Sequence, residues 1–262
     1  MTRFAVLGCV VLAAVEFSAC AKADSTTETS GGCATVFGGE VCSWSKATGG
    51  NTVEVGMTVP LSTIEGAPDG EMPAWPPQAA ATLNVPDAAR AASGIRIITM
   101  FWEAMGHPPG PYLVPHFDFH FNLISPADVA AIDCADTTKP AALPAAFGLP
   151  DVELPPEMAA MTGVATLVGL CVPRMGMHSM LASELASTTP FEGTMVIGYY
   201  HGNPIFVEPM ITRSKLMAKQ SFDLAVPEVP GLSGAHPTRF HAEYDAASNA
   251  YRFVFSEFSP AG

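Results

Sequence analysis

The sequence predicts a mainly β fold of the α+β kind, an antiparallel β-sandwich or barrel with a few short helices. Residues 116–123 alternate polar and apolar side chains without a break, which is the period of a strand. The 24 prolines and 23 glycines favour many turns and short elements over long helices. Patterns of strand, polar turn and strand recur at residues 195–210 and 239–255, as in β-hairpins.

Two strands and one helix are expected before the alternating segment. Residues 52–59 alternate weakly, and residues 95–102 have the apolar, β-branched composition of a buried strand. Between them, residues 86–92 predict a short helix that begins with a proline and ends near a glycine. A proline-rich turn at residues 106–111 then leads into residues 116–123. We expect these two strands to be antiparallel neighbours.

The second half of the chain continues this alternation of strands and turns. Ser125 and Pro126 open a short helix, with the serine as its cap and the proline at its first position. Residues 135–156 form a Pro/Ala-rich loop that is long for a compact domain, which indicates a lid, an insertion or a contact within a homo-oligomer. Residues 163–172 predict an apolar strand, and the two hairpins follow it.

The N-terminus has the pattern of an export signal. Arg3 supplies a positive charge, and residues 4–15 form an apolar stretch that is too short to span a bilayer. We therefore expect residues 1–19 to be a signal peptide, residues 20–32 a flexible tether and residues 33–262 a single β-rich domain. The mature protein is expected in the periplasm or the outer cell envelope.

Two routes of processing are open. Residues 17–20, Phe-Ser-Ala-Cys, are similar to a bacterial lipobox, although Phe17 stands where leucine is usual. Cleavage there would leave a lipid on Cys20 and anchor the protein to a membrane. Residues 21–23, Ala-Lys-Ala, instead fit ordinary cleavage before Asp24. We expect the lipoprotein.

The remaining cysteines predict disulfide bonds. Cys33, Cys42, Cys134 and Cys171 follow the signal region, and four cysteines in an exported chain favour two disulfides over a thiolate metal site. Four cysteines allow three pairings. One of these joins Cys33 to Cys42 in a short loop and Cys134 to Cys171 in a long one.

Charge and motif content exclude several function classes. The 12 basic and 25 acidic residues give a net charge of −13, so nucleic acid is not an expected partner. The sequence has no Gly-x-Ser-x-Gly motif for a serine nucleophile and no glycine loop of the kind that cradles phosphate.

The polar face of the alternating segment is the candidate site. Its phenylalanines would pack in a core, which places His116, Asp118, His120 and Asn122 in a row on the other face. Imidazole and carboxylate groups are metal ligands. At about 3.3 Å per residue, His116 and His120 are roughly 13 Å apart, too far for one ion. One or two residues of this row are therefore expected to bind any given metal, and another element completes the set.

Other elements supply the remaining candidates. His178 lies two residues after Gly176, which permits close backbone approach. Glu208 ends a strand, where its carboxylate would complete a set of two histidines and one acid, cap a neighbouring turn or pair with Arg213. His107, Tyr112 and Tyr200 are expected in the surrounding polar pocket. Such ligands suit a divalent ion, namely zinc, iron or manganese, and an open position on it would activate water or bind oxygen.

A different function remains compatible with the same residues. The His/Asp row would serve as an internal hydrogen-bond network in a structural or self-assembling envelope protein without catalytic activity. The metal content of the protein separates this alternative from the metal-site hypothesis. The sequence alone does not decide whether the protein is an enzyme.

Five short motifs together resemble a known family. They are Gly-His-Pro-Pro at 106–109, Pro-His-Phe-Asp-Phe-His-Phe at 115–121, Met-Gly-Met-His at 175–178, Gly-Tyr-Tyr-His-Gly at 198–202 and Glu-Pro-Met-Ile-Thr at 208–212. In this order and spacing they resemble a family of exported bacterial proteins of unknown function, typified by a Thermus protein under extracytoplasmic sigma-factor control. The resemblance runs from about Trp44 to Phe258 and implies a β-rich exported domain, but no particular reaction. Family members often carry Trp and Asp after the histidine of the third motif, where this chain has Ser179 and Met180.

Overall fold

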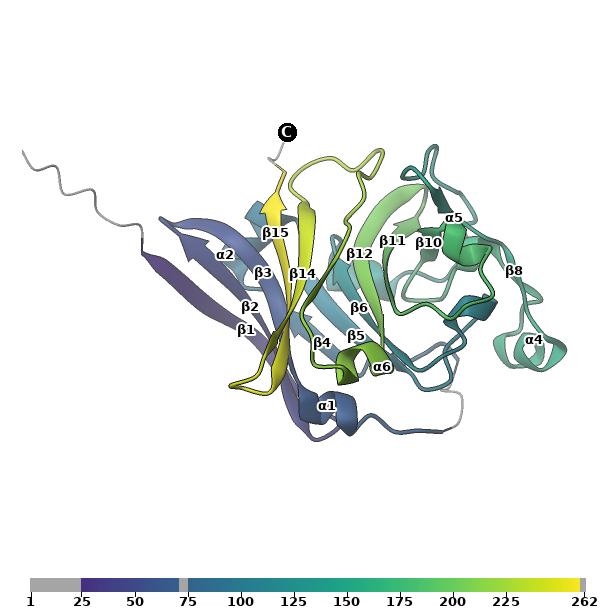
Figure 1. Ribbon diagram of the computed structural model, residues 1–262. Coiled ribbons are helices and arrows are strands. Elements are labelled where there is room, and N and C mark those ends of the chain that lie inside the picture. The colour runs from purple at the N-terminus through teal and green to yellow at the C-terminus, as the bar shows by residue number, and fades with distance from the viewer. Residues whose placement is uncertain (1–24, 71–74, 260–262) are drawn as a thin grey trace, which may run out of the picture.

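The computed structural model describes residues 25–70 and 75–259 of the chain. In this part of the chain, two antiparallel sheets form a sandwich rather than a closed barrel (Figure 1). The predicted signal peptide and Cys20 lie outside the described residues. Among the residues that are described, no helix is long and apolar enough to cross a membrane.

The first sheet combines the N-terminal strands with the C-terminal ones. Its strands, in spatial order, are β1 (Thr26–Val36), β2 (Gly39–Thr48), β3 (Asn51–Pro60), β15 (Ala250–Phe258), β14 (Pro237–Asp245) and β13 (Phe222–Leu224). The last long strand of the chain thus pairs with β3, so the two ends of the domain lie in one sheet.

The second sheet carries the His/Asp segment near its centre. Its strands, in spatial order, are β4 (Ala81–Asn84), β5 (Ile97–Glu103), β6 (His116–Asn122), β12 (Asn203–Thr212), β11 (Gly193–Tyr200), β10 (Met177–Leu181) and β7 (Phe147–Gly148). A separate two-stranded sheet pairs β8 (Val152–Glu153) with β9 (Thr166–Leu167).

Short helices connect the strands. They are α1 (Leu61–Glu65), α2 (Asp87–Ser93), α3 (Pro126–Ala130), α4 (Pro156–Thr162), α5 (Ala182–Leu185) and α6 (Arg213–Met217), with 3-10 turns at Gly110–Tyr112 and Val168–Leu170. Helix α4 lies between β8 and β9 at the margin of the molecule (Figure 1).

Aromatic rings from the two sheets meet in the main core. The ring centroids of Phe119 and Phe253 are 4.5 Å apart, and those of Phe121 and Phe255 are 4.6 Å apart. All four side chains are fully buried. The apolar face of β6 therefore packs against β15 of the other sheet, as the alternation in its sequence predicts.

The outer face of the second sheet is covered as well. A second apolar cluster, which includes Leu154, Leu170, Met180 and Phe206, packs there. Much of it comes from the segment that contains β8, β9 and α5, which lies beside β10–β12 (Figure 1). As a result β6 is buried on both faces, and its polar residues are only 0 to 4% exposed.

Most sequence-based expectations for the fold are confirmed. The class is mainly β, β5 and β6 pair antiparallel, and both predicted hairpins form, as β11–β12 and β14–β15. Helix α3 has Ser125 as its expected cap, within a capping box in which the Ser125 hydroxyl and the Asp128 side chain each accept from the other's backbone N–H. Both disulfides form with the pairing Cys33–Cys42 and Cys134–Cys171.

Two expectations need correction. Strand β1 begins at Thr26, so residues 26–32 of the expected tether are a strand, because this threonine-rich stretch pairs with residues 44–48 of β2. The apolar run at 163–172 is not one strand. It divides into the short β9 and a 3-10 turn, in which Gly169 has a φ of 61° that a regular strand does not contain.

Truncation of Phe119 tests the packing of the sandwich. We expect Phe119→Ala to lower the free energy of unfolding by about 3–5 kcal/mol, because a fully buried ring is removed between the sheets. Chemical denaturation measures this change, and Met217→Ala, at a site that is 38% exposed, serves as the control. A loss below about 1 kcal/mol for Phe119→Ala would contradict the packing described here.

Candidate metal centre

The polar row of β6 divides into two groups of potential ligands. His107, His116 and Asp118 form the first, and His120, His178 and Glu208 form the second. Within each group, one ligand atom from every residue lies within 4.8 Å of the others. His116 and His120 belong to different groups, as expected for two residues that stand four positions apart on an extended strand.

The first group is local in sequence. His107 comes from the proline-rich turn before β6, and His116 and Asp118 come from β6 itself. The Nε2 atom of His116 is 3.3 Å from Oδ1 of Asp118, and Nε2 of His107 is 4.0 Å from Oδ2. Ligands at about 2.1 Å from a tetrahedral zinc ion are roughly 3.4 Å apart, so a small shift of His107 would close this set around one ion.

The second group joins three strands of the sheet. His120 comes from β6, His178 from β10 and Glu208 from β12. The Nε2 atom of His120 is 3.5 Å from Oε1 of Glu208, and Nε2 of His178 is 4.0 Å from Oε2. This group also contains two imidazoles and one carboxylate, and its spacing is close to that of the first.

Backbone carbonyls fix the orientation of three histidines. Nδ1 of His107 lies 2.8 Å from the carbonyl oxygen of Pro108. Nδ1 of His116 lies 2.6 Å from that of Val114, and Nδ1 of His178 lies 3.0 Å from that of Leu170. A carbonyl oxygen only accepts, so Nδ1 carries the proton and Nε2 keeps its lone pair. Each of these Nε2 atoms lies within 4.0 Å of a carboxylate oxygen of its own group. The same arrangement holds histidines that ligate metals.

His120 is oriented by packing. Its ring stacks on that of Phe206, with a centroid distance of 4.3 Å and an interplanar angle of 17°. The ring of Phe101 has its centroid 5.0 Å away and is tilted by 49° relative to the imidazole. Gly198 is needed for this arrangement, since a Cβ there would lie 2.0 Å from the ring of Phe206. The sheet thus places His120 between aromatic rings, with Nε2 toward Glu208.

Several buried polar atoms at these groups have no hydrogen-bond partner among the described residues. They are Nε2 of His116, Oδ1 of Asp118, Nε2 of His120 and Oε2 of Glu208. A buried polar atom without a partner costs free energy, and most such atoms in proteins are paired. The atoms of His116, Asp118 and Glu208 are acceptors when the carboxylates are ionised, and Nε2 of His120 is an acceptor when its proton is on Nδ1. A proton or a metal cation is therefore needed between the His116 and Asp118 atoms.

The ionisation of the groups reflects their burial. Burial lowers the pKa of His116 to about 3 and of His178 to about 4, so both imidazoles are neutral at pH 7. Burial, and then repulsion from Glu208 and Glu103, raises the pKa of Asp118. Burial would also raise the pKa of Glu208, but the imidazoles around it outweigh burial and hold its pKa below the usual range.

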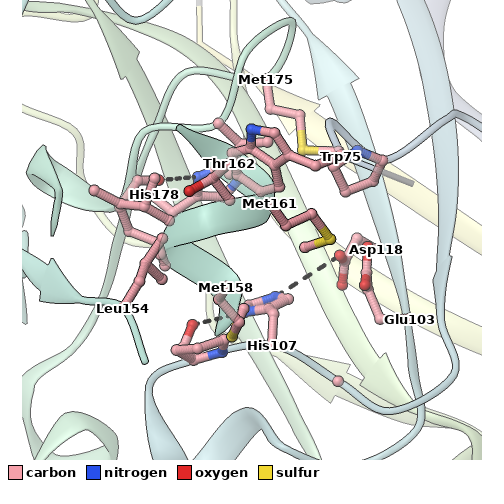
Figure 2. Close-up of a pocket in the computed structure, with 16 residues that line it drawn as sticks. Trp75, Glu103, His107, Asp118, Leu154, Met158, Met161, Thr162, Met175 and His178 are labelled. Carbon is pink, nitrogen blue, oxygen red and sulfur yellow. Dashed lines mark hydrogen bonds and ion pairs between the residues drawn. The ribbon is translucent and has the colours of Figure 1, made fainter. Parts of the chain in front are cut away.

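A pocket opens onto the first group. Its walls are largely apolar, and Glu103, His107, Asp118 and His178 supply its ionisable side chains (Figure 2). Its cavity volume is about 60 Å³, enough for several waters at roughly 10–15 Å³ each. The side chain of His107 is 25% exposed, whereas those of His120 and Glu208 are at most 2% exposed. His107 is therefore the most accessible of the six residues, and His178 of the second group also lines the pocket at 7% exposure.

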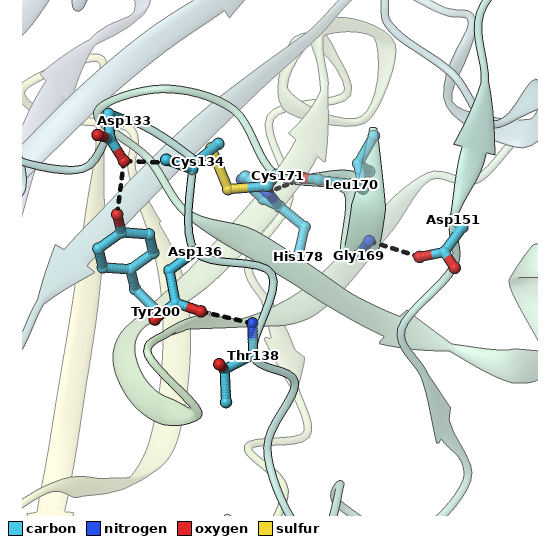
Figure 3. The surroundings of a disulfide bond; sticks show 11 residues. Asp133, Cys134, Asp136, Thr138, Asp151, Gly169, Leu170, Cys171, His178 and Tyr200 are labelled. Atoms are coloured by element: carbon cyan, nitrogen blue, oxygen red, sulfur yellow. Dashed lines mark hydrogen bonds between the residues drawn. A yellow bond between two sulfur atoms is a disulfide. The ribbon is translucent and has the colours of Figure 1, made fainter. Parts of the chain in front are cut away.

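The long-range disulfide supports the second group. Cys171 follows Leu170, whose carbonyl accepts from Nδ1 of His178, and Cys134 ties this turn to the loop after α3 (Figure 3). Asp151 also holds the turn, since its Oδ1 accepts from the backbone N–H of Gly169 at 2.7 Å. The carbonyl that orients His178 is thus fixed on two sides.

A third cluster of potential ligands has a simpler explanation. Cys33, Glu40 and Cys42 lie together near the turn between β1 and β2. The two cysteines form a disulfide, so neither sulfur is free as a thiolate ligand.

The structure places the other predicted residues differently. Tyr112 is fully buried, and its hydroxyl donates to Glu184, with its ring 6.2 Å from that of His107. Tyr200 requires correction, because its hydroxyl donates to Asp133 at the surface and it does not line the pocket. His107, expected only in the surroundings, belongs to the first group itself.

Glu103 is a site residue that the sequence analysis missed. It is 5% exposed at the end of β5, directly opposite His116, and it lines the pocket (Figure 2). Thr99, Phe101 and Glu103 alternate along β5, so the register with β6 would have placed this carboxylate beside the His/Asp row.

Comparisons with known proteins give no family for the chain. No protein-family model matches it, and neither does any curated protein or solved structure.

Replacement of Glu103 should change how stability depends on pH. Burial and then the charge of Glu208 raise its pKa from 4.5 to about 7. When the pKa of a carboxyl is higher in the folded state than in the unfolded state, the unfolded chain loses the proton first as the pH rises. The free energy of unfolding therefore falls between the two pKa values, here 4.5 and about 7. We expect Glu103→Gln in the metal-free protein to gain up to about 3 kcal/mol over wild type at pH 8 and nothing at pH 4.

Urea unfolding at both pH values, in the presence of a chelator, measures this difference. Glu65→Gln changes an exposed glutamate and is the matched control. An equal effect of Glu103→Gln at pH 4 and pH 8 would show that Glu103 ionises normally.

Proposed function

We propose that the chain is an exported protein that binds two divalent transition-metal ions, one in each group of two histidines and one carboxylate. The first ion, held by His107, His116 and Asp118, faces the pocket and has a position open to water or a small ligand. The second ion, held by His120, His178 and Glu208, would lie deeper, with only His178 of its three ligands in the lining of the pocket.

The observation that carries this proposal is the convergence of lone pairs in buried space. Nε2 of His116 and Oδ1 of Asp118 are 3.3 Å apart without a hydrogen bond, although the ring of His116 is fully buried. A carboxylate and an imidazole lone pair repel at this distance unless a cation or a proton lies between them. One divalent ion per group would satisfy all of the unpartnered atoms at once.

The ligand set favours zinc. Two histidines and one carboxylate with an open fourth position form a common catalytic zinc site, and the same set also binds iron or manganese. Two disulfides indicate an oxidising compartment, in which zinc is stable because it has no redox chemistry. Zinc at the first group would lower the pKa of a bound water and so supply a hydroxide at neutral pH.

The alternative of a metal-free structural network is less favoured. A hydrogen-bond network in a buried site needs a donor for each acceptor. In the first group, the raised pKa of Asp118 would allow one carboxyl proton to bond Nε2 of His116. In the second group, the lowered pKa of Glu208 keeps its carboxylate ionised, so it has no proton to donate. The imidazoles of His120 and His178 would then have to supply the hydrogen-bond donors.

Export and anchoring remain part of the proposal. The disulfides support an extracytoplasmic location. A lipid on Cys20 would tether the domain to the envelope, and mass spectrometry of the mature N-terminus distinguishes this from cleavage before Asp24. Cys20 stands only a few positions before Thr26 in the sequence, where β1 begins. A lipid on Cys20 would therefore hold the first sheet close to the membrane surface.

Metal analysis of single variants tests the two-ion assignment. We expect close to two zinc ions per wild-type chain and one in either His116→Ala or His120→Ala, because each substitution removes a ligand from one group. Elemental analysis of the untagged mature protein measures the content, and circular dichroism checks that each variant remains folded. His241→Ala removes a histidine of β14 that bonds Asp223 and is the matched control.

Wild-type protein without metal that takes up none on addition of zinc would overturn the proposal. Loss of both ions in each variant, with the fold retained, would instead indicate one shared centre.

Removal of the long-range disulfide should weaken the second ion selectively. In Cys134→Ser/Cys171→Ser the turn that carries the Leu170 carbonyl is released, and loss of such a supporting bond typically lowers metal affinity by about 10- to 100-fold. Competition with a zinc chelator measures both affinities, and the first should stay unchanged. Cys33→Ser/Cys42→Ser is the matched control, and an equal loss in both double variants would contradict a specific supporting role.

A further inference from the structure

The pocket above the first group separates ionisable and apolar surfaces. Glu103, His107 and Asp118 lie together on one side, where the dashed contact joins His107 to Asp118 (Figure 2). Apolar side chains, among them Trp75, Met158 and Met161, form much of the remaining lining (Figure 2). His178 and Thr162 also line the pocket away from these three residues (Figure 2), but Nδ1 of His178 lies 3.0 Å from the Leu170 carbonyl oxygen and its Nε2 lies 4.0 Å from Glu208. A ligand in this space would therefore meet most of the polar chemistry at the end formed by Glu103, His107 and Asp118.

The lining excludes highly polar and anionic ligands. Among the described residues that line the pocket, none is lysine or arginine, and apart from the two carboxyl groups the hydrogen-bonding side chains are those of Trp75, His107, Thr162 and His178. Phosphates are bound through cations or converging N–H groups, and sugars need several hydrogen-bond partners. The carboxylates of Glu103 and Asp118 would repel an anion that does not bind the metal directly.

The apolar wall comes largely from one excursion of the chain. Strands β8 and β9 form a short antiparallel pair, and α4 between them carries Met158 and Met161 over the pocket. No residue of α4 is fully buried, and Met161 is 42% exposed. Methionine side chains are flexible and polarisable, so they adapt to apolar ligands of different shapes.

We propose that the pocket takes a small uncharged molecule with an apolar body and a single oxygen-bearing head that ligates the first metal ion. The head would occupy the open position at His107, His116 and Asp118, and the body would lie between Trp75 and the methionines of α4. This inference rests on the proposed metal site and adds the class of ligand that the site accepts.

Two hydroxamic acids with the same head test the apolar body. Hexanohydroxamic acid carries four more methylene groups than acetohydroxamic acid, and both are uncharged until they meet a metal. We expect the zinc-loaded mature protein to bind the longer acid at least about tenfold more tightly, because each buried methylene adds affinity. Isothermal titration calorimetry measures both, with the zinc content determined on the same sample.

A pair of methionine variants locates the binding. Met161→Asp places a charge in the apolar wall and should remove the preference for the longer acid. Met217→Asp changes a methionine at the end of α6, which is 38% exposed and does not line the pocket, and should leave the preference intact. Both variants should keep the wild-type zinc content.

The outcomes separate the inference from the metal proposal. Full zinc content with equal affinity for the two acids overturns the apolar-body assignment and leaves the metal site in place. A preference for the longer acid that survives Met161→Asp overturns the assigned position of the body. A protein that holds no zinc and binds neither acid overturns both proposals.

Discussion

The structure depends on burying charged and polar groups beneath an apolar cover. β6 has a core on one face and a second apolar cluster on the other, so its row of imidazoles and carboxylate is enclosed. Glu103 and Glu208 add two more buried carboxylates to the same region. Isolated buried charges are expensive in a protein interior, and the expense falls only when an opposite charge lies nearby. No lysine or arginine among the described residues forms an ion pair with these acids, and His116 and His178 are neutral at pH 7, so a proton or a metal cation is needed to offset the carboxylate charges.

The surroundings keep these groups in fixed orientations. Three imidazoles donate to backbone carbonyls, and the fourth is stacked between aromatic rings. The disulfide at Cys171 and the carboxylate of Asp151 hold the turn that supports His178. Such support lowers the freedom that each ligand would lose on binding an ion, and it is the arrangement expected where geometry matters for function. A protein that used these histidines only as packing groups would gain little from it.

The sequence was informative about features that depend on local patterns, and uninformative about contacts between residues that are distant in sequence. The alternation at residues 116–122 predicted both the strand and its polar row, because side-chain direction in a strand follows from a period of two. It could not show that the polar face would be covered, since the cover comes from residues more than thirty positions away, such as Leu154 and Leu170. Glu103 was missed because its role depends on the register between β5 and β6. Tyr200 was misplaced because its neighbour in space, Asp133, lies in a loop without a sequence signature.

The two groups differ in what a bound ion would do to the fold. The residues of the first group come from the turn before β6 and from β6 itself. An ion there would close only a short loop and would remove little conformational freedom from the unfolded chain. The ligands of the second come from β6, β10 and β12, which are distant in sequence. An ion there would cross-link three strands and remove more freedom from the unfolded chain, as any link that closes a long loop does. Exposure differs most between His107, which is 25% exposed, and His120 and Glu208, which are at most 2% exposed, although His178 of the cross-linking group also lines the pocket. The enclosed position is suited to stability, whereas the open one is where a ligand could exchange without disturbing the sheet.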